Sequence, residues 1–369
     1  MRAKLLTISA AIAGLLALPA VAGAQAKVSV YGLAHVSVDS INGKGTTGGA
    51  DDGSKLQVSS NSSRLGVKAV ADLGGGLKGI AQYEMNVAAD GEGDATSVST
   101  TTTVSGVTGA TATSTSTATS SRLLGNARNS FVGLEGGFGT VLAGIHDTPL
   151  KIVGRAVEFF PEYIGDARNL TEQDLRPNNV VAYLSPSFSG VNVNLAYVVD
   201  EDASKSQDAY SASVTYSGGP VMVGGAYESF KNPSSYYKTL YRLVAQYKAG
   251  PVRVAGQYQQ GSNKANVSGA DRMVYGLGAS YTLGAAVLKA QYYSADSADN
   301  ATTANGATMY AIGADYNLGS QTTVYVAYAS TDNDTAGTFK VNAGGHGDSM
   351  TPRAGQSPSG FSIGMIQKF

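Results

Sequence analysis

Side chains that could carry out catalysis or bind a transition metal are scarce in this sequence of 369 residues. It contains three histidines, His35, His146 and His346, and no cysteine. A serine hydrolase needs a serine, a histidine and a carboxylate or amide brought together, whereas His146 with Asp147 has the character of a turn. Scattered histidines without cysteine also give little support for a metal site. The residues therefore favour a protein that is not an enzyme and needs no cofactor.

Charged side chains are the other residues with chemical potential. Residues 148–176 contain five acids and three aromatic residues, namely Glu158, Glu162, Asp166, Glu172 and Asp174 with Phe159, Phe160 and Tyr163. A connection of this length is usually functional or disordered, and its aromatic residues indicate that it packs against something. Basic residues occur at polar positions of the alternating segments described next: Arg64, Lys68, Arg128, Arg242, Arg253, Arg272 and Lys289.

The elements that must position these charges are β-strands, because the dominant hydrophobic period from residue 27 onward is two. Val191, Val193 and Leu195, for example, alternate with Asn192 and Asn194. Such strands have one apolar and one wet face. No stretch beyond the N-terminus approaches the roughly 20 consecutive apolar residues that a membrane-spanning helix needs.

The connections between these strands alternate between short and long. Short turn signals occur at residues 73–76, 136–139, 189–190, 217–220, 249–251, 283–284 and 318–320, and longer polar stretches separate them. Transmembrane barrels have this asymmetry, with tight turns on one side and long loops on the other. The pattern predicts sixteen strands, at residues 27–40, 55–73, 77–89, 128–136, 139–147, 178–188, 191–201, 208–217, 221–231, 237–249, 252–261, 271–283, 285–296, 307–318, 321–332 and 357–369.

A soluble all-β protein is the alternative, but it would place the apolar face inside and would rarely need sixteen long strands. In a membrane barrel the faces are inverted, and closure leaves no unpaired backbone groups in lipid. Tyrosines near the ends of the predicted strands fit the aromatic girdles of such a barrel: Tyr210, Tyr216, Tyr236, Tyr237, Tyr241, Tyr247, Tyr275, Tyr281, Tyr310 and Tyr316.

The N-terminus has the anatomy of an export signal. Arg2 and Lys4 precede an apolar run from residue 5 to residue 18, and small residues follow Pro19. Cleavage is expected after Ala24 or Ala26, so that residues 1–26 form a signal peptide and residues 27–369 the mature barrel. The mature chain has 24 basic and 27 acidic residues, a formal charge of minus three. This charge gives no electrostatic support for nucleic-acid binding.

Residues 92–121 consist almost entirely of Thr, Ser, Ala, Gly and Val. We expect this low-complexity tract to be a long external loop, parts of which could extend the flanking strands because Thr and Val favour β-structure. It suggests no chemistry.

Several short motifs resemble the trimeric general porins of Gram-negative bacteria, especially those typical of beta-proteobacteria. In chain order, and spanning the mature chain, they are Val30–Gly32, Asn61–Gly66, Asp72–Lys78, Asn129–Leu134, Gly137–Thr140, Arg176–Val180 and Lys368–Phe369. The resemblance implies a 16-stranded antiparallel transmembrane β-barrel in the outer membrane, assembled as a homotrimer. It also implies a third loop, residues 148–176, that folds inward and narrows the pore.

The constriction implied by this family has acids on the loop and bases on the wall. Glu158, Glu162 and Asp166 are the candidates on the acidic side, and the candidates on the basic side are Arg64, Arg128 and Arg176. Their opposed charges would create a transverse field that orients dipolar solutes. The chain departs from the family at Ile145, where relatives carry a pore-lining arginine, so the basic side is expected to be weaker.

The leading functional hypothesis is a water-filled channel for passive diffusion of small hydrophilic solutes and ions, in contact with outer-membrane lipid. The alternatives are a substrate-preferring channel and a non-conducting barrel that serves as an adhesin or structural anchor. The final strand places Phe361, Ile363, Met365 and Phe369 on one face. In the resembling family a terminal aromatic residue is the signal that the barrel-assembly machinery reads.

Overall fold

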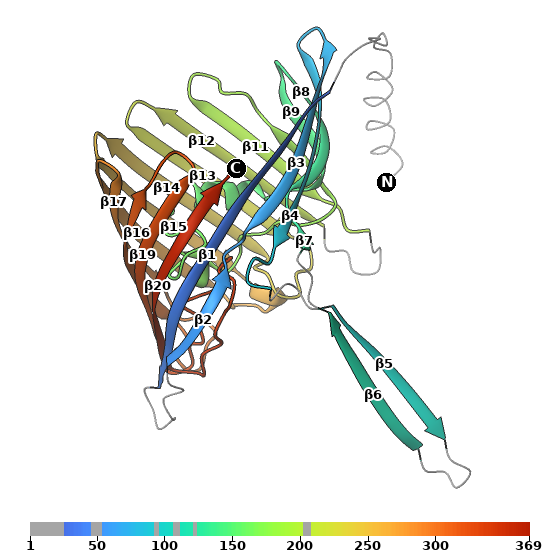
Figure 1. Cartoon of the computed structure of the whole chain (residues 1–369), viewed down its shortest axis with the longest axis vertical. Coiled ribbons are helices and arrows are strands. Elements are labelled where there is room, and N and C mark those ends of the chain that lie inside the picture. The colour runs from blue at the N-terminus through green and yellow to red at the C-terminus, as the bar shows by residue number, and fades with distance from the viewer. Residues whose placement is uncertain (1–25, 46–53, 92–95, 106–110, 121–123, 202–207) are drawn as a thin grey trace.

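The structure is a computed structural model that describes residues 26–45, 54–91, 96–105, 111–120, 124–201 and 208–369 (Figure 1). Almost all of the expected signal peptide lies outside these residues, so its cleavage after Ala24 or Ala26 stays a prediction.

Eighteen β-strand segments among the described residues form one antiparallel sheet that closes on itself. They are β1 (Lys27–Gly45), β2 (Ser54–Ser60), β3 (Arg64–Gly74), β4 (Leu77–Val87), β7 (Leu124–Ala127), β8 (Ser130–Gly136), β9 (Gly139–Ile145), β10 (Val180–Leu184), β11 (Val191–Val198), β12 (Ala209–Gly218), β13 (Val221–Phe230), β14 (Thr239–Ala249), β15 (Val252–Ser262), β16 (Arg272–Leu283), β17 (Ala286–Ala295), β18 (Ala307–Asn317), β19 (Thr322–Asn333) and β20 (Gln356–Lys368).

These segments make sixteen spans, which confirms the predicted count. β2 and β3 pair with successive parts of β1, and β7 and β8 pair with successive parts of β4, so each couple is one interrupted strand. The first interruption contains Ser62, whose φ of 52° lies in the left-handed region and breaks the ladder locally.

The barrel closes where the last strand meets the first. β20 pairs with β1 along its length, and the Phe369 and Gly32 backbones exchange hydrogen bonds of 3.1 and 3.0 Å. The Phe369 ring lies over Gly32, and a methyl group added at Gly32 would collide with that ring. Phe369 is exposed on the same side as Met365, Ile363 and Phe361, as the alternation predicted.

The two faces of the sheet have the inverted character predicted for a membrane barrel. Large apolar side chains such as Leu195, Leu277 and Ile312 are exposed, while polar side chains such as Gln257 and Gln259 are buried. A sheet with an apolar outside and a polar inside is typical of strands between lipid and an aqueous lumen.

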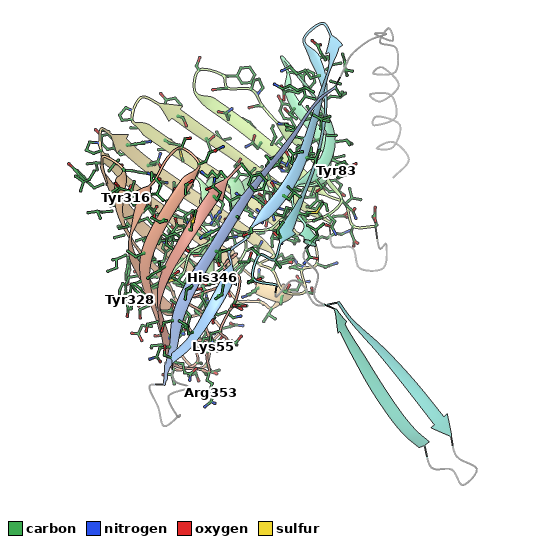
Figure 2. The ribbon with its side chains drawn as sticks, in the orientation of Figure 1. Lys55, Tyr83, Tyr316, Tyr328, His346 and Arg353 are labelled. Carbon is green, nitrogen blue, oxygen red and sulfur yellow. The ribbon has the colours of Figure 1, made fainter. Side chains whose placement is uncertain are left out.

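Exposed tyrosines occur toward both ends of the strands. Figure 2 shows Tyr83 and Tyr316 toward the end with the tight turns, and Tyr328 nearer the opposite end. One expected girdle residue was wrong: Tyr237 is buried inside the barrel, with its hydroxyl 2.9 Å from Glu172. It follows the exposed Tyr236 directly, and neighbouring residues of an extended chain point to opposite faces.

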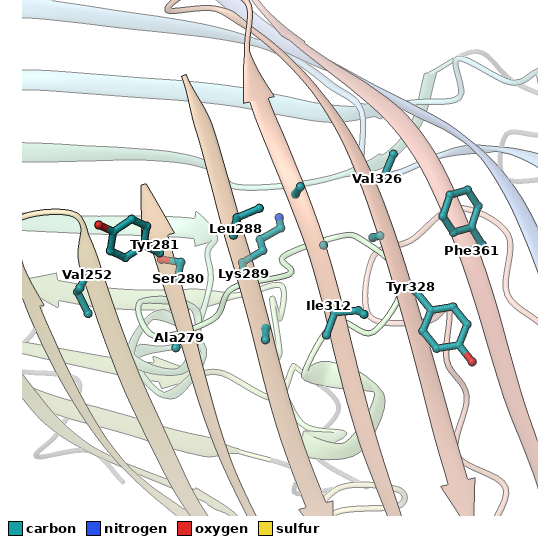
Figure 3. Close-up of a pocket in the computed structure, with 14 residues that line it drawn as sticks. Val252, Ala279, Ser280, Tyr281, Leu288, Lys289, Ile312, Val326, Tyr328 and Phe361 are labelled. Atoms are coloured by element: carbon teal, nitrogen blue, oxygen red, sulfur yellow. The ribbon is translucent and has the colours of Figure 1, made fainter. Parts of the chain in front are cut away.

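A pocket of about 620 Å³ indents the outer face over β15 to β20 (Figure 3). Apolar residues such as Leu288, Ile312 and Phe361 line it together with small residues such as Ala290. Lys289 appears in the same view, but its ammonium group lies 2.9 Å from Asp315, which turns it to the inner side. The pocket therefore belongs to the lipid-facing surface.

Short turns join the strands at one end of the barrel and long connections join them at the other (Figure 1). The Thr-rich tract contributes β5 (Thr96–Ser105) and β6 (Thr111–Ser120), which pair with each other in a separate two-stranded sheet. They project from the end with the long connections. The tract is thus an external hairpin and does not extend the neighbouring barrel strands.

The 148–176 connection holds two short helices, α2 (Pro149–Arg155) and α3 (Arg168–Thr171). No helix in the described part of the chain is both long enough and apolar enough to cross a membrane.

The inverted faces predict a specific cost for a charge on the outside of the barrel. Leu277 lies near the middle of β16 and is 66% exposed. Leu277→Arg should lower the free energy of unfolding by about 2–4 kcal/mol, the usual cost of arginine at the bilayer midplane. Urea unfolding in lipid vesicles measures this loss of unfolding free energy. Thr302→Arg, in the exposed β17–β18 connection, is the control, and equal losses in both variants would contradict the assigned orientation.

Candidate functional site

The segment 148–176, which we call the third loop, begins with a capped helix and is closed at its base by a hydrogen bond. Pro149 occupies the first turn of α2, and the Thr148 hydroxyl caps that helix by accepting a hydrogen bond from the Lys151 amide. The Thr148 amide donates to the Leu175 carbonyl oxygen at 3.1 Å, which ties the two ends of the loop together.

A hydrophobic core forms between the third loop and the sheet. Leu150, Val153, Phe160 and Ile164 of the loop are almost fully buried. They pack in one cluster with wall residues of β14, β15, β18 and β19, namely Leu240, Val244, Ala255, Ala311, Tyr325, Ala327 and Ala329. Burial of each large side chain stabilises the docked loop by about 1.5–3 kcal/mol. The wall residues that contact the loop in this cluster are therefore mostly apolar.

Small wall residues make room for the loop. A methyl group at Gly278 would collide with the Phe159 ring, and one at Gly313 would lie 3.0 Å from Phe160. A methyl group added at Gly165 of the loop would lie only 2.7 Å from the Cβ atoms of Ala311 and Ala329. Glycine and alanine on the wall thus let the loop backbone lie directly against the strands.

Wall bases on β14, β15 and β17 hold the loop in place. Arg242 contacts Asp174 at 2.6 Å and donates to the Leu150 carbonyl oxygen at 3.2 Å. The Arg253 guanidinium lies 4.1 Å from the centre of the Phe159 ring, and the Lys289 ammonium lies 3.6 Å from the centre of the Tyr163 ring. The alternation of the strands predicts these bases on the polar face, and there they contact the third loop.

Two of the three loop acids predicted for the constriction are buried inside the loop. The side chains of Glu158 and Asp166 are 2% and 0% exposed. Arg155 binds both carboxylates, Asp166 at 3.2 Å, and Arg168 binds Asp166 at 2.7 Å. The Asp166 carboxylate also accepts from the Glu162 amide at 2.6 Å. Both acids therefore hold the loop's shape.

The two buried carboxyl groups titrate differently. Burial, and then the charge of Asp166, raises the pKa of Glu158 to about 8. Burial also disfavours the Asp166 carboxylate, but Arg168 and Arg155 outweigh it and lower the pKa of Asp166. Arg168 and Arg155 thus favour the charged form of Asp166 more strongly than that of Glu158.

Glu162, the remaining one of the three acids predicted on the loop, contacts Arg64, one of the bases predicted on the wall. Its carboxylate lies 3.5 Å from the Arg64 guanidinium, and the two side chains are 14% and 25% exposed. The Arg155 guanidinium lies 3.9 Å from the same carboxylate. Of the acid and base sets predicted for the constriction, Glu162 and Arg64 are the pair that the structure brings into contact between the loop and the wall.

The other two predicted bases bind acids that the sequence analysis did not select. Arg128 binds Glu84 at 2.6 Å, and Arg176 binds Asp147 at 2.9 Å. Burial opposes the ionisation of Asp147, but the charges of Lys151 and Arg176 lower its pKa to about 2. Asp147 stands two residues after Ile145, so Arg176 supplies a basic group close to that position.

Sequence reasoning also missed Arg155, which touches all three predicted loop acids. A signal for it existed, because Arg155 stands three residues before Glu158 and such neighbours meet on a helical turn. The β19–β20 connection was missed as well. Its Val341 carbonyl oxygen accepts from Gly165 at 2.7 Å, and His346 lies 3.2 Å from Asp39 of β1.

Within the residues that the structure describes, no group of three or more histidines and acids has the arrangement of a metal site. The charged contacts described above comprise ion pairs within the third loop, within the wall and between the two.

The role of Asp166 can be tested by removing its charge. Asp166→Asn leaves Arg155 and Arg168 without their shared carboxylate in a buried place, a loss usually worth about 3–5 kcal/mol. Hydrogen exchange of amides 158–170 should report a correspondingly easier opening of the loop. Glu135→Gln, which breaks the exposed pair with Lys78, should change opening by less than about 1 kcal/mol. Unchanged protection in Asp166→Asn would refute the anchoring role.

The lowered pKa of Asp147 predicts a pH effect with a defined sign. A carboxylate whose pKa is lower in the folded protein stabilises it above about pH 4, and this contribution disappears as the pH falls toward 2. A shift from 3.8 to about 2 corresponds to about 2 kcal/mol. Asp147→Asn should therefore be less stable than the parent at pH 6 and equal to it near pH 2, as measured by urea unfolding. A difference independent of pH would contradict the assignment.

Known proteins share both the sequence pattern and the fold. The pattern of the Gram-negative porin family matches residues 9–336. The major outer membrane protein P.IB of Neisseria gonorrhoeae is 26% identical over 201 residues, 52% of this chain and 49% of that protein. Its counterpart in Neisseria meningitidis serogroup B is 27% identical over 212 residues, 56% and 55% of the two chains. The chain spans about half the length of the curated relatives it matches.

Solved structures match over nearly the whole chain. An anion-selective porin from Comamonas acidovorans gives a TM-score of 0.74 at 24% identity, over 94% of this chain and 100% of that one. OmpT, an outer membrane protein of Vibrio cholerae, gives 0.67 at 15% identity, over 93% and 98%. At such identities the likeness concerns the fold. With the family pattern covering most of its length, the chain belongs to the Gram-negative porins, which confirms the predicted outer-membrane location.

Proposed function

We propose that this porin is a water-filled channel for passive diffusion of small hydrophilic solutes and ions. The observation that carries the proposal is the combination of a polar inner face with a third loop docked against only part of it. Family membership and the fold support the same conclusion. We also propose that the third loop folds inward and narrows the pore, since its contacts reach wall residues from β1 to β19 on the buried face, such as His35 and Tyr325.

The charges that face a solute are proposed to be those with partly exposed side chains. Glu162, Arg155 and Arg64 stand on the two sides of the proposed gap between loop and wall, and Arg176 continues the basic side along the wall. Arg128 is buried against Glu84 and lies outside this set. Glu158 and Asp166 contribute through the positions they impose on Arg155. The resulting field lies across the path of the solute, where it orients dipoles and retards apolar molecules.

The partners of the barrel are proposals as well. A homotrimer is supported by the related fold of the Vibrio cholerae protein, which has been solved in a trimer form. Outer-membrane lipid would cover the exposed apolar residues of the outer face. The barrel-assembly machinery would read the last strand through Phe369, which is exposed at its end.

Planar-bilayer recording tests the channel directly. The purified protein should insert with stepwise conductance increases, because each insertion opens a continuous aqueous path. Heat-unfolded protein is the control. A folded preparation that binds the bilayer without conductance steps would overturn the channel and favour the non-conducting anchor.

Charge changes at the gap test the constriction. Arg64→Gln should shift the reversal potential in a salt gradient toward cations, and Glu162→Gln should shift it toward anions, because each removes one charge from the narrow region. Lys231→Gln, at an exposed position of the β13–β14 connection, is the control and should leave the reversal potential unchanged. Shifts of the same direction in the Arg64 and Glu162 variants would exclude these residues from the constriction.

A further inference from the structure

A polar cavity of about 350 Å³ opens at the long-connection end of the barrel. It lies where α3 of the third loop meets the β15–β16, β17–β18 and β19–β20 connections. Its charged lining consists of Arg168, Lys264, Arg272 and Lys340 against the single carboxylate of Glu172. We call it the α3 cavity; the ion pairs of the constriction, such as that of Arg64 with Glu162, are not part of it.

Two of these four positive charges are already neutralised. Arg168 binds the buried Asp166, and Lys264 binds Glu172 at 2.7 Å. Arg272 lies farther from Glu172, at 3.8 Å, and Lys340 donates to the Ser349 hydroxyl at 3.1 Å. Lys264 and Arg272 thus share Glu172, and the four cations face two carboxylates, an excess of about two positive charges by the ordinary charge states of these groups.

One hydrogen-bond donor of Arg272 lacks an acceptor. The residue is 8% exposed, and its guanidinium donates to the Asn305 side chain at 3.0 Å and lies 4.8 Å from the centre of the Phe339 ring. Its buried Nε has no hydrogen-bond partner among the described residues. A buried donor without a partner costs free energy that a bound acceptor would recover.

We propose that the α3 cavity binds a small organic dianion of the dicarboxylate class before it enters the channel. This inference rests on the proposed diffusion function, to which it adds a class of preferred solute. Arg272 and Lys340 stand on different elements, β16 and the β19–β20 connection, which suits two separate carboxylates. The volume is at the small end of ligand sites, and a site on a diffusion path must bind weakly enough to release its solute.

Calorimetric titration of the purified protein in detergent micelles with sodium succinate, at constant ionic strength, tests the site. We expect saturable binding. Arg272→Gln and Lys340→Gln should each weaken it by about tenfold, since each removes a charge-assisted contact. Glu172→Gln should tighten binding, because it removes the one carboxylate of the lining and keeps an amide that can still accept from Tyr237.

Lys238→Gln is the matched control, since Lys238 is exposed on the β13–β14 connection at the same end of the barrel and is not part of the lining. It should leave succinate binding unchanged. Weakening equal to that of Lys340→Gln would show a general field effect and overturn the site. Tighter binding of inorganic phosphate than of succinate would overturn the dicarboxylate assignment, as would a lack of saturable heat.

Bilayer recording tests the dicarboxylate site separately from the proposed diffusion channel. Succinate added on the side of the long connections should lower the single-channel current of the parent and leave that of Arg272→Gln unaffected. Channels that conduct and ignore succinate overturn the dicarboxylate site alone. A protein without conductance overturns the diffusion channel, and calorimetry then still decides whether the cavity binds a dianion.

Discussion

A bilayer offers no hydrogen-bond partner to backbone amide and carbonyl groups, so every strand in it must be paired on both sides. The chain meets this constraint by bringing β20 back to β1, with the final exchange between Phe369 and Gly32. Closure removes the free edges, and the alternation of side chains then assigns every residue of a strand either to lipid or to the interior. The polarity of the interior is a consequence of that assignment.

A polar interior would hold an inserted segment poorly, and the chain solves this locally. Where the third loop docks, the inner face changes to Leu240, Val244 and the alanines of β18 and β19. Polar side chains remain where they serve the loop backbone. The Gln291 side chain accepts from the Phe159 amide at 3.2 Å and donates to the Gly165 carbonyl oxygen at 2.7 Å. The barrel thus carries a small apolar core on the inside of a sheet whose outside is also apolar.

Strand number, closure and face orientation could be predicted because they depend on a period of two and on turn residues. Residues that are an even number of positions apart in one strand lie on the same face of the sheet. This rule correctly placed Phe361 and Phe369 on one face. The third loop has no such period. Whether Glu158 or Glu162 faces the gap depends on local turns around positive-φ residues such as Glu162 itself, at 69°. The same limit explains why the orientation of Tyr237, which lies at a strand boundary, was predicted wrongly. It also explains why the contact of Val341 with Gly165 could not be predicted, because it joins two connections far apart in sequence.

The docking of the third loop also determines how selectivity can change. Its apolar core, the glycine contacts and Arg242 hold the loop backbone against β14 to β19 at many points, so sliding the loop would break several of them together. Replacing Arg64, Arg155 or Glu162 alters charge at the gap while that core stays intact, although Arg155 also holds Glu158 and Asp166 in place. Within the proposed constriction, Arg64 and Glu162 are therefore the positions at which a substitution changes the charge with the smallest loss of stability.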